Sequence, residues 1–293
     1  MKNYKGVMYA MLASTAFGLM PIFAKYAYIN GSNANTVLLY RFAISAVLLF
    51  IYLKFKKIDM RVTKKQFFTI SLLGILGYTV TTQTLFMSYD YLDVGLASTL
   101  HFIYPAIVCI IEFIIFKKLM GKPKIISLIL AGIGVYSLVA FEQRTIHGFG
   151  VFLAIFSGVT YSISIIVLSL KEIKDIDNRV TTMYLSLSAA VGMFIYGLFD
   201  KSIIPEVNVH LVIAYVLIAV VSTILGIILL LKAIEMIGAS SASILSTFEP
   251  IISIVLGVIL FGEKLTFALF IGGAFIIVSA IIIAKDKDSK NIE

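Results

Sequence analysis

Two charged side chains lie inside long apolar stretches, where their type and position point to chemistry. Arg41 lies in the stretch 34–53 and Glu249 in the stretch 239–261. An ionisable side chain is costly to bury in a bilayer, so each is a candidate functional residue. A guanidinium group can bind a carboxylate or a phosphate through two parallel hydrogen bonds, which suits Arg41 to such a substrate group. The alternatives for Arg41 are contact with lipid headgroups or a structural ion pair.

A proline and one further carboxylate accompany these charges. Glu249 directly precedes Pro250, and it could hold a substrate ammonium group or carry a coupling proton. Its alternative roles are structural, as a partner of Arg41 or of a backbone donor. Glu112 lies near the end of the stretch 95–116, and we expect it to be an interfacial carboxylate beside Lys117 and Lys118.

Aromatic and polar side chains near the prolines complete the candidate substrate-binding site. His101 and Pro105 are four residues apart and share one helix face, and Tyr104 precedes Pro105 as Glu249 precedes Pro250. These side chains would line an amphipathic pocket, although a histidine in a membrane helix can equally be a packed hydrogen-bonding residue. Weaker candidates, each also explained by hydrogen bonds between helices, are Tyr78, Gln83, Thr84, Tyr161 and Ser222.

The remaining residues give no catalytic, metal or cofactor pattern. Three histidines and the single Cys109 are scattered and lack metal-ligand spacing. The Gly-x-Gly segments at 132–134 and 148–150 do not follow a strand, which argues against a nucleotide-binding loop. We find no HExxH motif and no paired intramembrane aspartates, so an intramembrane enzyme is disfavoured. One Arg and one Glu are also too few for the ring of like groups that a channel needs.

The elements that carry these residues follow from composition. Of 293 residues, 60% are hydrophobic and 14% charged, and the mean hydropathy is +1.03. A single soluble core cannot bury this apolar surplus, so the sequence predicts an all-α polytopic membrane protein. Continuous Ile/Leu/Val runs rather than alternating residues argue against a β-barrel. We expect ten transmembrane helices, at 6–27, 34–53, 67–88, 95–116, 124–141, 148–170, 180–199, 209–231, 239–261 and 266–284.

The basic residues predict the orientation of these spans. The chain has a formal net charge of +8, and its 24 Lys and Arg residues lie mostly in the gaps between spans. Nineteen of them fall on one side and four on the other, while Arg41 lies within a span. The positive-inside rule therefore predicts a protein of the cytoplasmic membrane with both termini in the cytoplasm. The charge orients the chain, and we expect no nucleic-acid partner. The first span is expected to be retained rather than cleaved as a signal peptide.

The chain also contains an internal repeat. Residues 6–17 resemble 150–161 at an offset of 144, and residues 95–107 resemble 240–252 at an offset of 145. We therefore divide one integrated membrane domain into a first repeat, 1–145, and a second repeat, 146–293, each with five spans. Because five is odd, the second repeat must enter the membrane from the opposite side. Inverted repeats with interrupted helices, here at Pro105 and Pro250, are typical of secondary transporters with a site near the midplane.

Several segments resemble one family of transporters. Residues 248–253 and 260–265 are similar to the second-repeat signature of the EamA-type transporters of the drug/metabolite transporter superfamily, and residues 13–18 and 40–42 are similar to its first-repeat pattern. The resemblance covers the whole chain. It implies a carrier of small metabolites, and bacterial members are often amino-acid exporters. The chain departs from the pattern at Phe116-Lys117-Lys118, where the second repeat has Phe261-Gly262-Glu263.

Together these features predict a secondary transporter that moves a small polar metabolite by alternating access. An Arg and a Glu in an aromatic pocket suit an amino acid or a related zwitterion. Without an ATP-binding motif, transport is driven by a gradient or is facilitative, and a channel-like carrier is the alternative. Matching glycines at 132–134 and 272–273 are expected to pack the two repeats together or to form a homodimer face. The expected partners are thus the substrate, the lipid bilayer and a second copy of the chain.

Overall fold

The structure, a computed structural model, describes residues 2–88, 90–92, 97, 100–117, 119–137, 147–204, 208–261 and 267–285. Every regular element in these residues is a helix, which confirms the all-helical fold. Two of the elements, η1 and η2, are π-helical. The elements are α1 (Lys2–Gly18), α2 (Met20–Ile29), α3 (Ala34–Phe55), α4 (Lys64–Leu72), η1 (Leu73–Thr79), α5 (Val80–Ser88), α7 (Tyr104–Phe116), α8 (Lys122–Ser137), α9 (Gly148–Leu168), α10 (Lys171–Lys174), α11 (Asn178–Asp200), α12 (Val209–Leu217), η2 (Ile218–Leu225), α13 (Gly226–Ser246), α14 (Glu249–Phe261) and α15 (Phe267–Lys285).

Polar residues in the connections start several of the long helices. Asn33, Thr63, Asp177 and Asn208 cap α3, α4, α11 and α12, and each side chain accepts a hydrogen bond from a backbone N–H of the first turn. These caps satisfy donors that a helix start otherwise leaves without a partner. The chain therefore enters these apolar helices through short polar turns.

Among the described residues, six helical segments are long and apolar enough to cross a bilayer. They are Tyr4–Ile29, Ala34–Phe55, Lys64–Ser88, Gly148–Leu168, Asn178–Asp200 and Val209–Ser246, and Tyr104–Phe116 and Phe270–Lys285 are shorter apolar helices. The segment Val209–Ser246 has 38 residues, far more than the roughly 20 that one crossing needs. Its backbone changes direction at Gly238, which has a φ of 80° that glycine adopts without strain. Ten crossings stay a prediction.

The two halves of the chain have matching interruptions. The π-helical segment η2 begins at Ile218, 145 residues after η1 begins at Leu73. Two turn residues precede Tyr104 at the start of α7, and two precede Glu249 at the start of α14, again 145 residues later. Pro105 and Pro250 are thus the second residues of new helices, a position where a missing N–H costs nothing.

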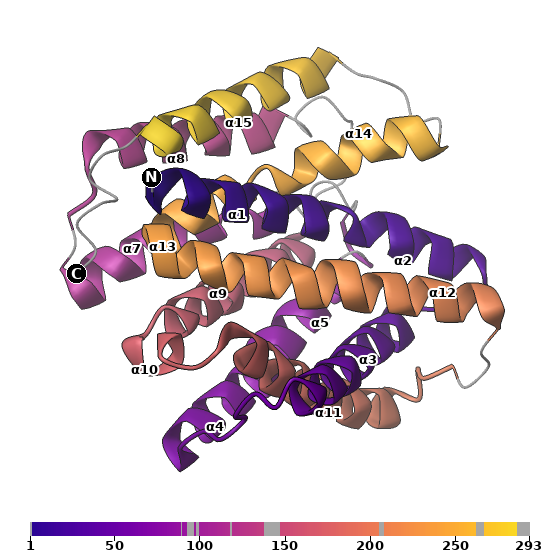
Figure 1. The fold of residues 1–293 in the computed structure, drawn as a ribbon. Coiled ribbons are helices and arrows are strands. Elements are labelled where there is room, and N and C mark those ends of the chain that lie inside the picture. The colour runs from indigo at the N-terminus through magenta and orange to yellow at the C-terminus, as the bar shows by residue number, and fades with distance from the viewer. Residues whose placement is uncertain are drawn as a thin grey trace.

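The helices of the two halves also pack in matching pairs (Figure 1). α1 packs against α13 and α14, and in the same way α9 packs against α5 and α7. α3 packs against α11, and α8 packs against α15. At the last contact, a Cβ on Gly134 would lie 2.8 Å from the carbonyl oxygen of Gly272, so the absence of a side chain allows the close approach. Gly132 and Gly273 face open space instead, so only part of the glycine pattern packs the halves together.

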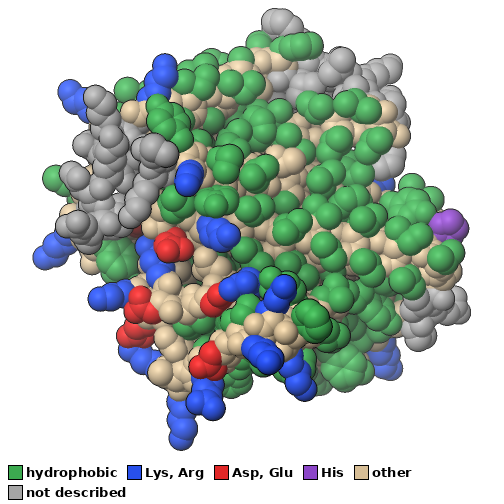
Figure 2. Space-filling model, viewed as in Figure 1, with side chains coloured by type: hydrophobic (Ala, Val, Ile, Leu, Met, Phe, Trp, Pro, Cys, Tyr) green, Lys and Arg blue, Asp and Glu red, His purple; other side chains and the backbone are tan. Residues whose placement is uncertain are grey.

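Lys and Arg side chains crowd the end of the molecule where α1 and α4 begin and where α10 lies (Figures 1 and 2). We call this the basic end. The opposite end carries the α2–α3 connection and the start of α12. Between the two ends, Figure 2 shows a surface that is largely hydrophobic. This distribution fits a helical bundle that crosses a membrane with its basic end on one side.

Candidate substrate-binding site

Aromatic rings from separate helices meet between the two halves. The Tyr104 ring of α7 and the Tyr161 ring of α9 have centroids 4.8 Å apart, and His101 lies 5.5 Å from each of them. Tyr78 of η1 extends the group, with its ring centroid 6.3 Å from that of Tyr161. The structure therefore brings together four of the residues that the sequence singles out.

Arg41 of α3 joins this group as a buried cation. Its side chain is only 4% exposed, and its guanidinium carbon lies 4.3 Å from the centroid of the Phe42 ring. One terminal nitrogen contacts the sulfur of Met20, and the Nε atom has no hydrogen-bond partner. The alternative in which Arg41 contacts lipid headgroups does not fit this structure, because neighbouring helices enclose the side chain.

Glu249 supplies the opposite charge from the start of α14. It interacts electrostatically with Arg41, Tyr104 and Tyr161. Among the described residues, however, no ion pair within 4.0 Å joins Glu249 to Arg41. The two charges therefore share one region without neutralising each other directly. The first turn of α14 also favours a carboxylate, because the helix dipole places partial positive charge there.

The interrupted segment before α7 is held by α9. The Nδ1 atom of His101 lies 2.9 Å from the Ser157 hydroxyl, and the Ser162 hydroxyl donates to the carbonyl of Tyr104 at 3.1 Å. A Cβ on Gly158 would lie 2.8 Å from the carbonyl oxygen of His101, so α9 presses closely against this segment. In lipid, carbonyls freed by a helix interruption must find such partners in neighbouring helices.

We call the group of Arg41, Tyr78, His101, Tyr104, Tyr161 and Glu249 the central site. Its side chains come from α3, η1, α7, α9 and α14 and from the residues just before α7. It combines a cation, an anion and aromatic rings with hydroxyl groups. The Tyr78 hydroxyl and the Arg41 Nε atom are both buried without a partner, so the site has unused hydrogen-bonding capacity.

Three weaker candidates lie elsewhere. The Gln83 side chain donates to Asn35 at 2.8 Å, within a group of polar residues at the opposite end. The Thr84 hydroxyl donates to the carbonyl of Val80 in its own helix at 2.8 Å. Ser222 is buried in η2, and its hydroxyl has no partner. No hydrogen bond links these three residues to the central site in the part of the chain that the structure describes.

Sequence reasoning missed the residues that support the site. Ser157 and Ser162 hold the segment before α7, and Met20 contacts Arg41. Ser157 lies one helical turn before Tyr161, and that spacing is a signal that could have found it, whereas Ser162 is the residue directly after Tyr161 and gives no such signal. The expectation for Glu112 is wrong: its side chain is only 7% exposed and bonds to Ser240, because α13 covers it.

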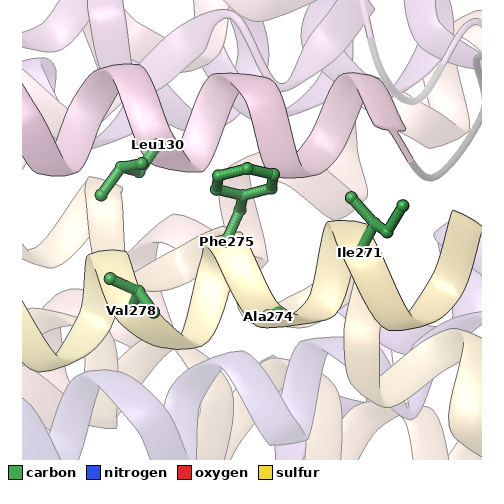
Figure 3. Close-up of a pocket in the computed structure, with 5 residues that line it drawn as sticks. All are labelled: Leu130, Ile271, Ala274, Phe275 and Val278. Carbon is green, nitrogen blue, oxygen red and sulfur yellow. The ribbon is translucent and has the colours of Figure 1, made fainter.

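Two other features of the described residues do not suggest a second site for a polar ligand. No group of three or more His, Cys, Asp or Glu side chains could hold a metal ion in the ranges given above. An open hollow between α8 and α15 is lined by apolar side chains alone (Figure 3): Leu130, Ile271, Ala274, Phe275 and Val278.

Known proteins with similar sequences and structures place the chain in a family. The model of the EamA-like transporter family matches twice, at residues 4–140 and 148–285. An uncharacterized transporter of Haemophilus influenzae is 31% identical over 130 residues, 44% of this chain and 42% of that protein. The uncharacterized transporter YyaM of Bacillus subtilis is 24% identical over 245 residues, 80% of this chain and 78% of its own length. The chain thus spans less than half of the first relative and most of the second.

A crystal structure with 12% sequence identity superimposes with a TM-score of 0.81, covering 94% of this chain and 95% of the other. This likeness shows a shared fold. The double family match covers almost the whole sequence and agrees with the repeated helix interruptions. The chain is therefore a member of the EamA-like transporter family, within the drug/metabolite transporter superfamily.

Proposed function

We propose that the protein is a secondary transporter that carries a small zwitterion, most simply an amino acid, across the cytoplasmic membrane by alternating access. The observation that supports this proposal is the pair of opposite charges in the central site. Arg41 and Glu249 interact through space, yet no ion pair joins them in the described residues. A zwitterion would supply one counter-charge to each.

The chemistry of the two groups fits such a ligand. The guanidinium of Arg41 can bind a carboxylate through parallel hydrogen bonds. The carboxylate of Glu249 can bind an ammonium group, and the faces of the tyrosine rings attract the same cation. Because water is largely excluded around a 4% exposed Arg41, these attractions are stronger than they would be in solution. Glu249 could instead carry a coupling proton, as the sequence suggests.

Alternating access fits the arrangement of the helices. The helix interruptions before α7 and α14 lie at the central site, where the two halves of the chain meet. In transporters with inverted repeats, one repeat moves against the other around a site near the midplane. We propose ten crossings in two inverted repeats, 1–145 and 146–293, with the basic end in the cytoplasm. A homodimer remains part of the proposal only as an expectation from the glycine pattern.

A ligand screen tests the substrate class. Purified protein is heated with amino acids, with the same compounds lacking the amino group, and with the same compounds lacking the carboxylate. Zwitterions at about 100-fold excess over Kd should raise Tm by about 5 °C, because ligand binding stabilises the folded state. Equal stabilisation by a singly charged analogue would contradict the zwitterion.

Counterflow in proteoliposomes then tests transport. A labelled amino acid that stabilises the protein should accumulate transiently in vesicles preloaded with the unlabelled compound. Absence of counterflow for every stabilising ligand would overturn the proposal that the protein is a carrier. The variant Arg61→Ala, whose side chain is 94% exposed at the basic end, is a control that should behave as the native protein does.

A further inference from the structure

A second buried carboxylate lies outside the central site, in the half of the molecule nearest the basic end. Glu112 is on α7, eight residues after Tyr104 and so about 12 Å further along the helix. It is only 7% exposed, and it accepts a hydrogen bond from the hydroxyl of Ser240 on α13, which is 2% exposed. A buried polar contact thus joins α7 to α13.

The surroundings of Glu112 contain few other ionisable groups. Cys109 lies one turn earlier on α7 and interacts with both Glu112 and Ser240. Lys124 of α8 is the other charged side chain that acts on Cys109 within the described residues. No ion pair involves Glu112 in that part of the chain.

Ionisable groups on the helices packed against α7 are engaged elsewhere. On α13, Lys232 lies 5.3 Å from the centroid of the Tyr9 ring, and Glu235 bonds to Asn178. On α9, Tyr161 belongs to the central site. Among the described residues, the direct polar contact of Glu112 is therefore its bond to Ser240.

The contact between Glu112 and Ser240 joins two segments that would have to separate for the basic end to open. Ser240 follows Gly238, where the backbone of α13 changes direction, and the segment after it leads to Glu249. Glu112 is on the helix that begins at Tyr104. Both helices therefore run from this contact to the central site. A path from the basic end to the central site between α7 and α13 requires these two segments to separate.

We propose that Glu112 is a proton-binding site that controls access to the central site from the basic end. The ionised carboxylate accepts a charge-assisted hydrogen bond from Ser240 and holds the two segments together. A proton from the water at the basic end neutralises the carboxylate, and the remaining neutral hydrogen bond is about half as strong. The segments then separate more readily, and the proton returns to water when they close.

This inference rests on the proposed alternating access but not on the substrate. Its reporter is already present, because Cys109 is the single cysteine and is fully buried beside the contact. The experiment measures the rate at which a maleimide labels Cys109 in the purified full-length protein. The variants are Glu112→Gln, a neutral carboxyl mimic, and Ser240→Ala, which removes the donor. The control is Glu235→Gln, a carboxylate change on the exposed side of α13.

We expect both test variants to be labelled about fivefold faster than the native protein, because each loses the charge-assisted bond. Glu235→Gln should be labelled at the native rate. The two test variants change the reactivity of the thiol itself in opposite directions: one removes a nearby negative charge, and the other removes a hydroxyl that stabilises the thiolate. Faster labelling in both therefore reports exposure. Native rates in Ser240→Ala would overturn the proposal even if Glu112→Gln failed to fold.

The pH dependence separates a proton-binding site from a fixed contact. The rate for the native protein, divided by that for Glu112→Gln at the same pH, cancels the pH dependence of the reagent's stability and most of the pH dependence of the thiol. This ratio should rise toward one as the pH falls, because the native carboxylate then becomes neutral. A constant ratio would overturn the proton site. Because no substrate is used, this outcome is independent of the ligand screen, which tests the central site alone.

Discussion

The two helix interruptions have the same backbone plan but different chemistry. Each has two turn residues followed by a helix whose second residue is proline, at Tyr104-Pro105 and at Glu249-Pro250. The first interruption presents a tyrosine and a histidine–serine contact, whereas the second presents a carboxylate. The buried cation Arg41 comes from α3 in the first half. The two repeats therefore share one backbone arrangement, and we expect substrate recognition to depend on the positions where they carry different side chains.

The neighbouring helices differ as well. In the first half the chain is interrupted between α1 and α2, at Leu19, just before Pro21, whereas its counterpart α9 is continuous. α1 packs against the second interruption: a Cβ on Gly18 would lie 2.9 Å from the carbonyl oxygen of Glu249. α9 packs against the first, where Gly158 approaches His101 in the same manner. The backbone contacts are thus similar, while only one interruption carries charge.

The largest expected effect comes from removing the cation. Arg41→Ala should weaken the binding of a zwitterion by about 100-fold, because it removes a buried bidentate partner of the carboxylate. Arg41→Lys should recover part of the loss, since it keeps the charge without the planar fork. Isothermal titration with a ligand from the screen measures both. Unchanged affinity in Arg41→Ala would show that Arg41 has a structural role. The proposed difference in charge between the two halves would then rest on Glu249 alone.

The carboxylate of the second interruption should have a smaller and more selective effect. Glu249→Gln should weaken binding of an amino acid by about tenfold, because a charge-assisted bond to the ammonium group is lost. The same variant should leave the affinity for the deaminated analogue unchanged. If both ligands lose affinity equally, Glu249 acts on the site in general rather than on the ammonium group. The comparison uses the same titrations, with Glu235→Gln as the control carboxylate.

The two glycines test whether the interruptions are mechanically equivalent. Gly158→Ala should lower the free energy of unfolding by about 1–3 kcal/mol, because its Cβ would meet the backbone of His101 and force α9 away. Gly18→Ala should cost a similar amount at the second interruption, where the carbonyl of Glu249 is equally close. Gly132→Ala, with no atom within 4 Å of its Cβ, should not be destabilised. Thermal unfolding in detergent measures all three; stability of Gly158→Ala at or above the native level would contradict the close packing.

The smallest effect is expected far from both interruptions, at the start of α11. The Arg179 side chain donates to Asp177 and lowers the pKa of that carboxyl below its usual value. A carboxyl with a lowered folded-state pKa adds stability above its unfolded pKa of about 4, and this contribution disappears as the pH falls through the folded value. Because the pair is about one-third exposed, the effect should be slight.

Melting temperatures of the native protein and Asp177→Asn should therefore differ slightly at pH 7 and converge below pH 4. A difference that persists at low pH would show that the Asn substitution acts through packing instead.

The sequence predicted the parts of this arrangement that depend on residue order. Apolar length gave the helices, and the repeated proline positions gave the interruptions at Tyr104 and Glu249. The central grouping of Arg41, Tyr78, His101, Tyr104 and Tyr161 followed from treating buried polar residues as candidates, and the structure does bring them together.

What the sequence could not supply is the rotation of each helix about its axis. Gln83 and Ser222 were candidates as much as the residues of the central site were, yet Gln83 bonds to Asn35 and the buried Ser222 hydroxyl has no partner. Glu112 looks interfacial from its distance to the lysines that follow, but α13 covers it. Such burial depends on contacts between residues more than a hundred positions apart, and neither span length nor local periodicity contains that information.

The π-helical segments η1 and η2 have a consequence for how the chain tolerates length changes. A π turn holds more residues than an α turn, so the helix that follows it is displaced in register from an uninterrupted α-helix. Deleting one residue within Leu73–Thr79 can be absorbed by closing the wide turn into a regular α turn, which keeps the orientation of Val80–Ser88. The hydrogen bond of Thr81 to Thr160, at 2.7 Å, would then be kept, whereas a deletion within Val80–Ser88 itself has no such turn to absorb it and would rotate the residues that follow by about 100°. The two wide turns are therefore the places where these helices tolerate the loss of one residue.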